Sequence, residues 1–181
     1  VCNSLSLICE QEGQNADQII KLANHHPRVN ILQQGIGVGG HCIPVDPWFL
    51  IDRYPKFTKH LLEARKINNL KTDHIFKKII NFISKYKLDF NTTPVILCLG
   101  LSYKKNSDDI RESPANYIFN KLKTKFKKVK SFDPNIDTKL SKLEIHNMII
   151  KSDVLIRLVN HREFNMEPLK SLINQKHILK F

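Results

Sequence analysis

The sequence predicts an α/β protein in which a helical segment, residues 1–88, precedes a small domain with a parallel sheet, residues 89–181. Two observations predict this arrangement. Apolar residues recur at helical spacing from Phe57 to Tyr86 with no glycine or proline between them, which is typical of a long helix. After a change of composition near residues 88–93, short apolar runs alternate with helical patterns, as they do where helices connect parallel strands.

The first segment begins with helices and continues into a stretch rich in turn-forming residues. Asn15, with Gln18 three residues later, is a typical helix start, and this helix should run to about Ala23. Residues 27–47 contain too many glycines and prolines to form a helix or a long strand.

The pattern at residues 57–86 predicts either one long helix or two nearly collinear ones. Its apolar residues cover more of the circumference than one small domain can bury, which favours a homodimer formed through this helix. An ordinary core helix explains the pattern equally well. The apolar positions are Leu61, Leu62, Ile67, Leu70, Ile75, Ile79, Ile83 and Tyr86.

Four strands and three helices are predicted in the second segment, with Ser113 as the N-cap of its first helix and Pro114 in that helix's first turn. The strands are residues 94–101, 129–132, 154–159 and 177–179, and the helices are about 114–125, 138–150 and 163–173. Because parallel sheets bind ligands at the carboxyl ends of their strands, the loop of residues 102–111 is a candidate site.

The net charge and the hydropathy of the chain indicate which classes of partner it can bind. The net charge of +12 favours anionic partners, although a solvated, lysine-rich surface explains it as well. No nucleic-acid signature is present and aromatic residues make up only 8%, so nucleic acid is not an expected partner. No apolar run approaches the ~18–20 residues of a membrane span. The first residues do not resemble a signal peptide, so we expect no membrane association and a cytoplasmic location.

The first candidate site is the glycine loop, residues 35–47, which has four glycines in six residues. Glycine lets the backbone approach a ligand and point N–H groups at it. A cysteine beside such donors, Cys42, can react as a thiolate, and Asp46 four residues later could position a water or move a proton. A tight turn with a buried cysteine explains the same residues.

The second candidate is the charged loop, residues 102–114, which leaves a strand and enters a helix. Helix N-termini bind phosphate, and Lys104 and Arg111 add positive charge. The loop is neither a Walker A motif nor a GxGxxG motif. A solvated loop with no ligand is the alternative.

Metal binding is not expected. His25 and His26 are adjacent but have no further ligand at suitable spacing, and the four cysteines, at positions 2, 9, 42 and 98, match no zinc pattern. We expect reduced thiols, with Cys98 buried in an apolar strand.

Taken together, these stretches resemble the UDP-glucose/GDP-mannose dehydrogenase family, most closely its UDP-N-acetylmannosamine dehydrogenase branch. The resemblance covers essentially the whole chain. It rests on residues 24–30 (NHHPRVN), 37–49 (GVGGHCIPVDPWF), 64–68 (ARKIN), Tyr103 with Lys104, 108–114 (DDIRESP), 132–134 (FDP) and 152–156 (SDVLI).

The resemblance implies a central helical domain followed by a Rossmann-like UDP-sugar-binding domain. It also implies oxidation of the C6 alcohol of a nucleotide sugar to a carboxylate with NAD as acceptor, and the expected nucleotide sugar is UDP-N-acetylmannosamine. Cys42 would be the nucleophile and Asp46 would assist hydrolysis of the resulting thioester. Gly39, Gly40, His41 and Lys104 would hold the UDP-sugar, Arg28 would reach a site across a subunit boundary, and Arg111 would lie near the cofactor.

The chain also departs from the family pattern. The family's N-terminal NAD-binding domain, with its GxGxxG motif, has no counterpart here, and the family's catalytic lysine and asparagine would precede Val1. We therefore expect a truncated form that neither binds NAD nor turns over by itself. A fragment that binds UDP-sugar or dimerises without catalysis is the alternative function.

Overall fold

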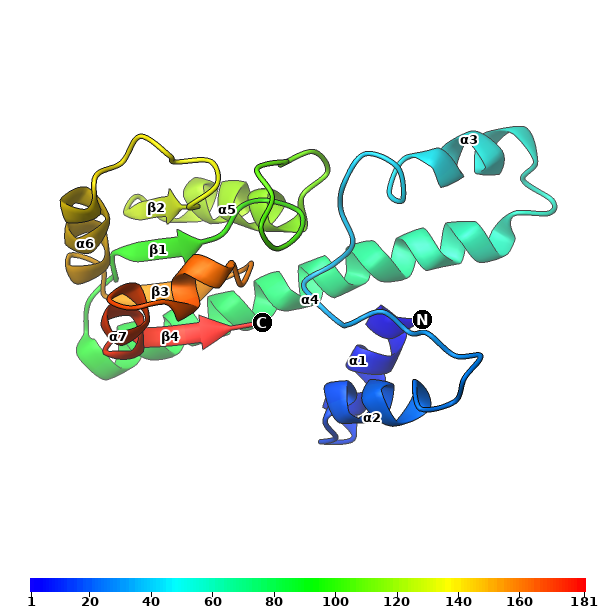
Figure 1. Cartoon of the computed structure of the whole chain (residues 1–181), viewed down its shortest axis with the longest axis horizontal. Helices are drawn as coiled ribbons and strands as arrows, with labels where there is room; N and C mark the ends of the chain where they lie inside the picture. Colours follow the sequence, from blue (N-terminus) through cyan, green and yellow to red (C-terminus); the bar gives the residue numbers. More distant parts are fainter.

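A single long helix, α4 (Lys59–Phe90), organises the computed structural model, which describes all 181 residues (Figure 1). Helix α3 (Asp46–Arg53) lies along its N-terminal part, helices α1 (Cys2–Gln11) and α2 (Ala16–Ala23) lie beside its middle, and a sheet lies beside its C-terminal part. The apolar pattern therefore corresponds to one continuous helix. It ends at Asn91, whose left-handed φ of 47° stops the helix.

Polar contacts fix α1 against α4. The Asn3 side-chain amide donates to Asn68 Oδ1 at 2.9 Å. At the other end of α1, Glu10 Oε1 lies 3.0 Å from His74 Nε2 and 2.9 Å from Lys78 Nζ. Helix α2 begins as predicted, with the Asn15 side chain accepting from the N–H of Gln18.

The C-terminal domain is built on a four-stranded, fully parallel sheet in the order β2-β1-β3-β4. The strands are β1 (Ile96–Leu99), β2 (Val129–Phe132), β3 (Val154–Arg157) and β4 (His177–Lys180). The connecting helices are α5 (Pro114–Lys125), α6 (Lys142–Ile150), the 3-10 helix η1 (Arg162–Asn165) and α7 (Leu169–Asn174). The predicted α/β class and parallel sheet are confirmed.

Both faces of the sheet are covered, because successive side chains of a strand point to opposite faces. One core cluster joins Ile96 and Cys98 of β1 to residues of α4 and α5 such as Ile79 and Ile118. A second cluster joins Leu97 and Leu99 to α6, η1 and α7. A strand buried on both faces is apolar at every position, which explains the uninterrupted run in β1.

Two predicted strands are shorter than expected, because 94–101 is reduced to Ile96–Leu99 and 154–159 to Val154–Arg157. Three predicted limits of helices were also wrong, each for a local reason. The helix predicted at 138–150 begins at Lys142, because Ser141 and Glu144 form a capping box there. The helix predicted at 163–173 is divided into η1 and α7 on either side of residues 166–168, which include Pro168. The stretch of residues 88–93 is not all linker, because α4 continues to Phe90.

Candidate functional site

The glycine loop is clamped between α4 and the start of α5. Asn68 of α4, only 6% exposed, pairs with the backbone of Val38 on both sides: its Oδ1 accepts from Val38 N–H at 2.7 Å and its Nδ2 donates to Val38 O at 3.1 Å. One helical turn later, Thr72 Oγ1 donates to Ile36 O at 3.0 Å. The Ile36 side chain is buried in the core cluster, and burial of that size is worth about 2 kcal/mol.

The opposite side of the loop packs against the charged loop so closely that only glycine fits. A Cβ on Gly39 would collide with the carbonyl oxygen of Glu112 and approach Pro114 Cδ to 2.8 Å. Gly40 has a φ of +99°, and its N–H donates to the carbonyl of Arg111 at 3.0 Å. The two candidate loops, about 70 residues apart in the sequence, therefore form one unit.

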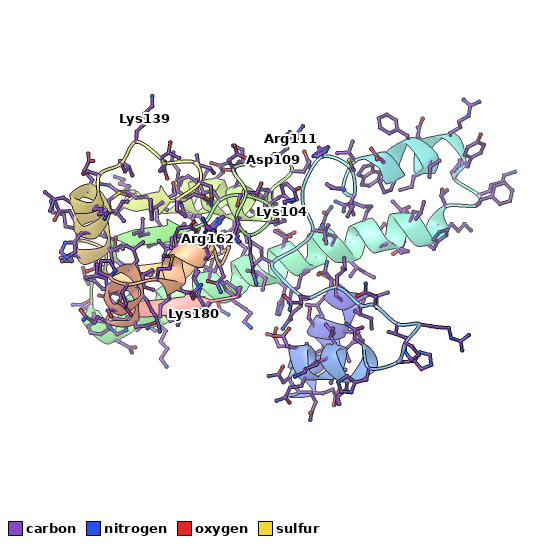
Figure 2. The ribbon with its side chains drawn as sticks, in the orientation of Figure 1. Lys104, Asp109, Arg111, Lys139, Arg162 and Lys180 are labelled. Atoms are coloured by element: carbon purple, nitrogen blue, oxygen red, sulfur yellow. The ribbon has the colours of Figure 1, made fainter.

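Side chains reinforce this contact at the surface. Arg111 donates hydrogen bonds from Nε and Nη2 to the Asp109 carboxylate, and the shortest of these is 2.7 Å. The hydrogen bonds from the Arg111 side chain and backbone lower the pKa of Asp109 to about 2. Arg111 Nη2 also lies 3.1 Å from His41 Nδ1, and because a guanidinium can only donate, that nitrogen of His41 accepts. Figure 2 shows Asp109 and Arg111 together at this edge of the molecule.

Cys42 and Asp46 are separated by one turn of backbone. The Cys42 carbonyl accepts from the N–H groups of Val45 and Asp46 at 3.0 and 2.8 Å, and Asp46 is the first residue of α3. Both side chains are exposed. The alternative of a buried cysteine is therefore wrong for Cys42. It is right for Cys98, which is fully buried, and burial raises the pKa of that thiol to about 12.

Arg28 lies apart from these residues. It follows α2 in the sequence, and α2 and α3 lie on opposite sides of α4 (Figure 1). The Arg28 side chain is exposed and forms no hydrogen bond or ion pair.

Lys104 borders a cavity of about 930 Å³ between the two halves of the chain. Its walls come from α1, α2 and α4, from residues 33–37 of the glycine loop, from residues 103–105, and from residues after β3 and at the end of β4. Two carboxylates, Glu10 and Asp17, face it with six lysines: Lys21, Lys71, Lys78, Lys104, Lys105 and Lys180. The excess of positive charge suits an anionic ligand. Cys42, Asp46, Gly39, Gly40, His41 and Arg111 do not line this cavity.

A buried polar network holds the backbone of Lys104 in place. Ser102 Oγ donates to Lys104 O at 2.8 Å and lies 3.2 Å from His161 Nε2. His161 Nδ1 accepts from the N–H of Asn106 at 3.0 Å. His161, Ser102 and Asp133 are all fully buried, so this network fixes the loop from below.

The start of α5 does not form a dinucleotide cradle. In such a cradle the pyrophosphate rests on the N-terminus of the helix that follows the first strand. Here Gly39 and Pro114 pack together at that place, and Ser113 caps the N–H of Asn116. The Arg111 side chain near this helix start is 63% exposed.

No three His, Cys, Asp or Glu side chains lie close enough together to hold a metal ion. No helix combines the length and the apolar character that crossing a bilayer requires.

Comparison with known proteins finds two domains of one family in this chain, one for the glycine loop and one for the charged loop. Residues 1–70 match the model of the UDP-glucose/GDP-mannose dehydrogenase family central domain, and residues 97–180 match that of the same family's UDP binding domain. The chain belongs to the UDP-glucose/GDP-mannose dehydrogenase family. These two domains account for both loops and for the parallel sheet.

Relatives within the dehydrogenase family are more than twice as long as this chain. It is 41% identical over 172 residues to UDP-N-acetyl-D-mannosamine dehydrogenase of Campylobacter jejuni, covering 90% of this chain and 41% of that protein. It is 39% identical over 169 residues to NDP-N-acetyl-D-galactosaminuronic acid dehydrogenase of Ralstonia nicotianae, covering 90% and 39%. The structure of UDP-D-ManNAc dehydrogenase from Pyrococcus horikoshii matches with a TM-score of 0.82 and 31% identity, over 99% of this chain and 43% of that one.

Sequence reasoning missed two residues on α4, Asn68 as a clamp and Lys71 as a cavity residue. Both stand on the stripe of α4 that continues as Ile75 and Ile79. A polar residue on an apolar helical stripe is the signal that could have found them.

Proposed function

We propose that this chain carries the substrate-binding part and the nucleophilic cysteine of a UDP-sugar 6-dehydrogenase acting on UDP-N-acetylmannosamine. One observation carries the proposal. The exposed Cys42 belongs to a glycine loop that packs tightly against the charged loop, and both loops contribute residues to a cavity with six lysines. The names of the relatives from Campylobacter jejuni and Pyrococcus horikoshii support the substrate class.

In this proposal the nucleotide occupies the cavity and the sugar extends towards Cys42. Lys104 contacts the diphosphate or the sugar, and the exposed His41, next to Gly39 and Gly40, holds the sugar end. The N–H of Gly40 itself is already donated to Arg111. A cavity of about 930 Å³ is large enough for a nucleotide, since ligand sites of this kind measure roughly 300–1,000 Å³.

The chemistry assigned to the chain is nucleophilic. The Cys42 thiolate adds to the carbonyl carbon of the C6 aldehyde, so that a C–S bond forms and the π bond of the carbonyl breaks. The oxygen takes up a proton from water and becomes the hydroxyl of a thiohemiacetal. Loss of a hydride from C6 and of the hydroxyl proton would convert the thiohemiacetal into a thioester. NAD, when bound, would supply the acceptor for this hydride and for the one removed from the alcohol, and Arg111 is the residue of this chain that we expect to contact it. Asp46 then takes a proton from the water that attacks the resulting thioester, which releases the carboxylate and restores the thiol.

A homodimer through α4 completes the proposal. Leu70 is 56% exposed in the middle of this helix. Helix α2, which Arg28 follows, and helix α3, which Cys42 precedes, lie on opposite sides of α4 (Figure 1). Both features fit an arrangement in which Arg28 of one copy reaches the site of the other.

The second candidate function is binding of a UDP-sugar without turnover. The filled helix start at Gly39 and Pro114 favours it for the isolated chain, because no dinucleotide cradle is available there. The reaction of Cys42 with a UDP-sugar 6-aldehyde separates the two, because that step needs no NAD. If the aldehyde protects Cys42 from iodoacetamide more strongly than the UDP-sugar itself does, the dehydrogenase is supported, and equal protection supports the second candidate.

Calorimetry with UDP and with NAD tests the proposed ligand. We expect UDP to bind with a measurable affinity and NAD to bind much more weakly. NAD binding as tight as UDP binding would contradict this assignment of the domains.

A further inference from the structure

Lys71 is a buried lysine without a partner. It is 4% exposed and lies in the wall of the cavity; the ammonium forms neither a hydrogen bond nor an ion pair, and its nitrogen stays accessible from the cavity. The nearby carboxylate that could neutralise it is Glu10, and that group is already engaged by His74 and Lys78 at 3.0 and 2.9 Å. Burial lowers the pKa of Lys71, with Glu10 opposing and Lys78 reinforcing the effect.

This arrangement is costly for packing alone. Desolvating an ammonium costs several kcal/mol unless an opposite charge or hydrogen-bond acceptors compensate it. The same stripe of α4 carries Ile75 and Ile79, so an apolar residue at position 71 would fill the space without that cost. A negatively charged ligand in the cavity therefore explains the positive charge of Lys71 better than packing does.

The surroundings indicate an anion as the missing partner. Lys104 and Lys105 face the cavity from the charged loop and Lys180 faces it from β4, while Lys71 faces it from α4. Figure 2 shows Lys104 on the loop that follows β1 and Lys180 at β4. A ligand held between them would meet positive charge from both halves of the chain, and a diphosphate carries enough negative charge for both.

We propose that Lys71 is a phosphate-binding residue that pairs with the diphosphate of the nucleotide sugar, opposite Lys104. The inference rests on the proposed function, because it takes the nucleotide to lie in this cavity. Lys71 then positions the nucleotide from the central domain, while Lys104 does so from the C-terminal domain. Inorganic pyrophosphate carries the same chemistry without the nucleoside.

The test is calorimetry on the full chain with UDP, uridine and pyrophosphate. Lys71→Met keeps the length of the side chain and removes its charge, and we expect it to weaken UDP binding by about tenfold or more while leaving uridine binding unchanged. Lys77→Met is the matched control, because Lys77 is an exposed lysine of the same helix outside the cavity. It should change UDP affinity by less than about twofold. Lys71→Arg should retain most of the affinity.

The outcomes separate this inference from the proposed function. If Lys71→Met binds UDP as tightly as the unmodified chain, the role of Lys71 is wrong and the proposed function stands. If the unmodified chain binds pyrophosphate through Lys71 but shows no added affinity for UDP, Lys71 is an anion site and the nucleotide assignment fails. Binding of neither ligand overturns both.

Amine labelling provides a second measurement that needs no variant. With the unmodified chain, UDP should slow acetylation of Lys71 by a water-soluble reagent while acetylation of Lys77 proceeds at the same rate. Equal rates at Lys71 with and without UDP, under conditions where UDP binds, would overturn the inference even if Lys71→Met did not fold.

Discussion

His161 and Asp133 form a fully buried pair, with His161 Nε2 3.0 Å from Asp133 Oδ2. Because His161 Nδ1 accepts from the N–H of Asn106 and from Asn135 Nδ2, the ring is neutral and donates from Nε2. Asp133 Oδ2 also accepts from the N–H of Leu101 at 2.7 Å. The pair therefore joins the ends of three strands beneath the charged loop.

Asp133→Asn should destabilise the chain by about 1–3 kcal/mol at neutral pH, because a buried donor of this network loses its charged acceptor. Urea unfolding measures the change. Asp108→Asn, an exposed aspartate of the same region, is the control and should change stability by less than about 0.5 kcal/mol. Equal effects of the two substitutions would show that the buried network contributes no particular stability.

The loss of stability caused by Asp133→Asn should depend on pH. Burial acts to raise the pKa of Asp133, but hydrogen bonds from His161, Leu101 and Asn135 outweigh it and hold the pKa below its ordinary value. Stability from a lowered folded-state pKa is complete above the unfolded-state value, about 3.9, and is lost as the pH falls through the folded-state value. The stability difference between the unmodified chain and Asp133→Asn should therefore shrink below about pH 4. A difference that stays constant down to pH 2 would contradict this ionisation.

Gly39→Ala should separate the glycine loop from the charged loop. The added methyl group meets the Glu112 carbonyl, Pro114 Cδ and Tyr103 Cβ, and overpacking of this kind costs about 1–3 kcal/mol. Gly35→Ala is the matched control, because a Cβ there meets nothing within 4 Å. Thermal unfolding should show a lower midpoint for Gly39→Ala only. The same midpoint for both variants would mean that the two loops do not pack as described.

Cys42 should react with iodoacetamide at about pH 7 far faster than Cys98. Cys42 is exposed, whereas Cys98 is fully buried with a pKa raised to about 12, so almost none of it is thiolate. Peptide mapping of labelled protein gives the two rates. A UDP-sugar should slow labelling of Cys42 if the sugar lies beside it. Labelling that is indifferent to the UDP-sugar would remove support for Cys42 as the nucleophile.

Leu70→Lys should weaken a dimer formed through α4. Leu70 is 56% exposed in the middle of that helix, and a charge there would be desolvated in an interface. Leu88→Lys is the control, because Leu88 is 83% exposed in the last turns of α4. Size-exclusion chromatography with light scattering measures the mass. A monomeric unmodified chain at tens of micromolar would contradict the dimer.

Much of the fold could be predicted from local pattern. The helical spacing after Phe57 gave α4, the caps at Asn15 and Ser113 gave the starts of α2 and α5, and the apolar runs gave all four strands. These signals are local because a helix or strand buries one face or both, and the spacing of its apolar residues along the sequence indicates which faces are buried. The resemblance to a dehydrogenase family was equally local, since it rested on continuous motifs such as those around Cys42 and Arg111.

Tertiary structure alone decided how those motifs meet. No periodicity indicates that Gly39 lies on Glu112, that Asn68 pairs with Val38, or that Lys71 is buried in a cavity opposite Lys104. Each of these contacts joins residues that are 30 or more positions apart, as the 30-residue separation of Val38 and Asn68 illustrates. Which polar groups become buried together depends on how the helices and the sheet pack. The type of one residue does not indicate which distant residue it will contact.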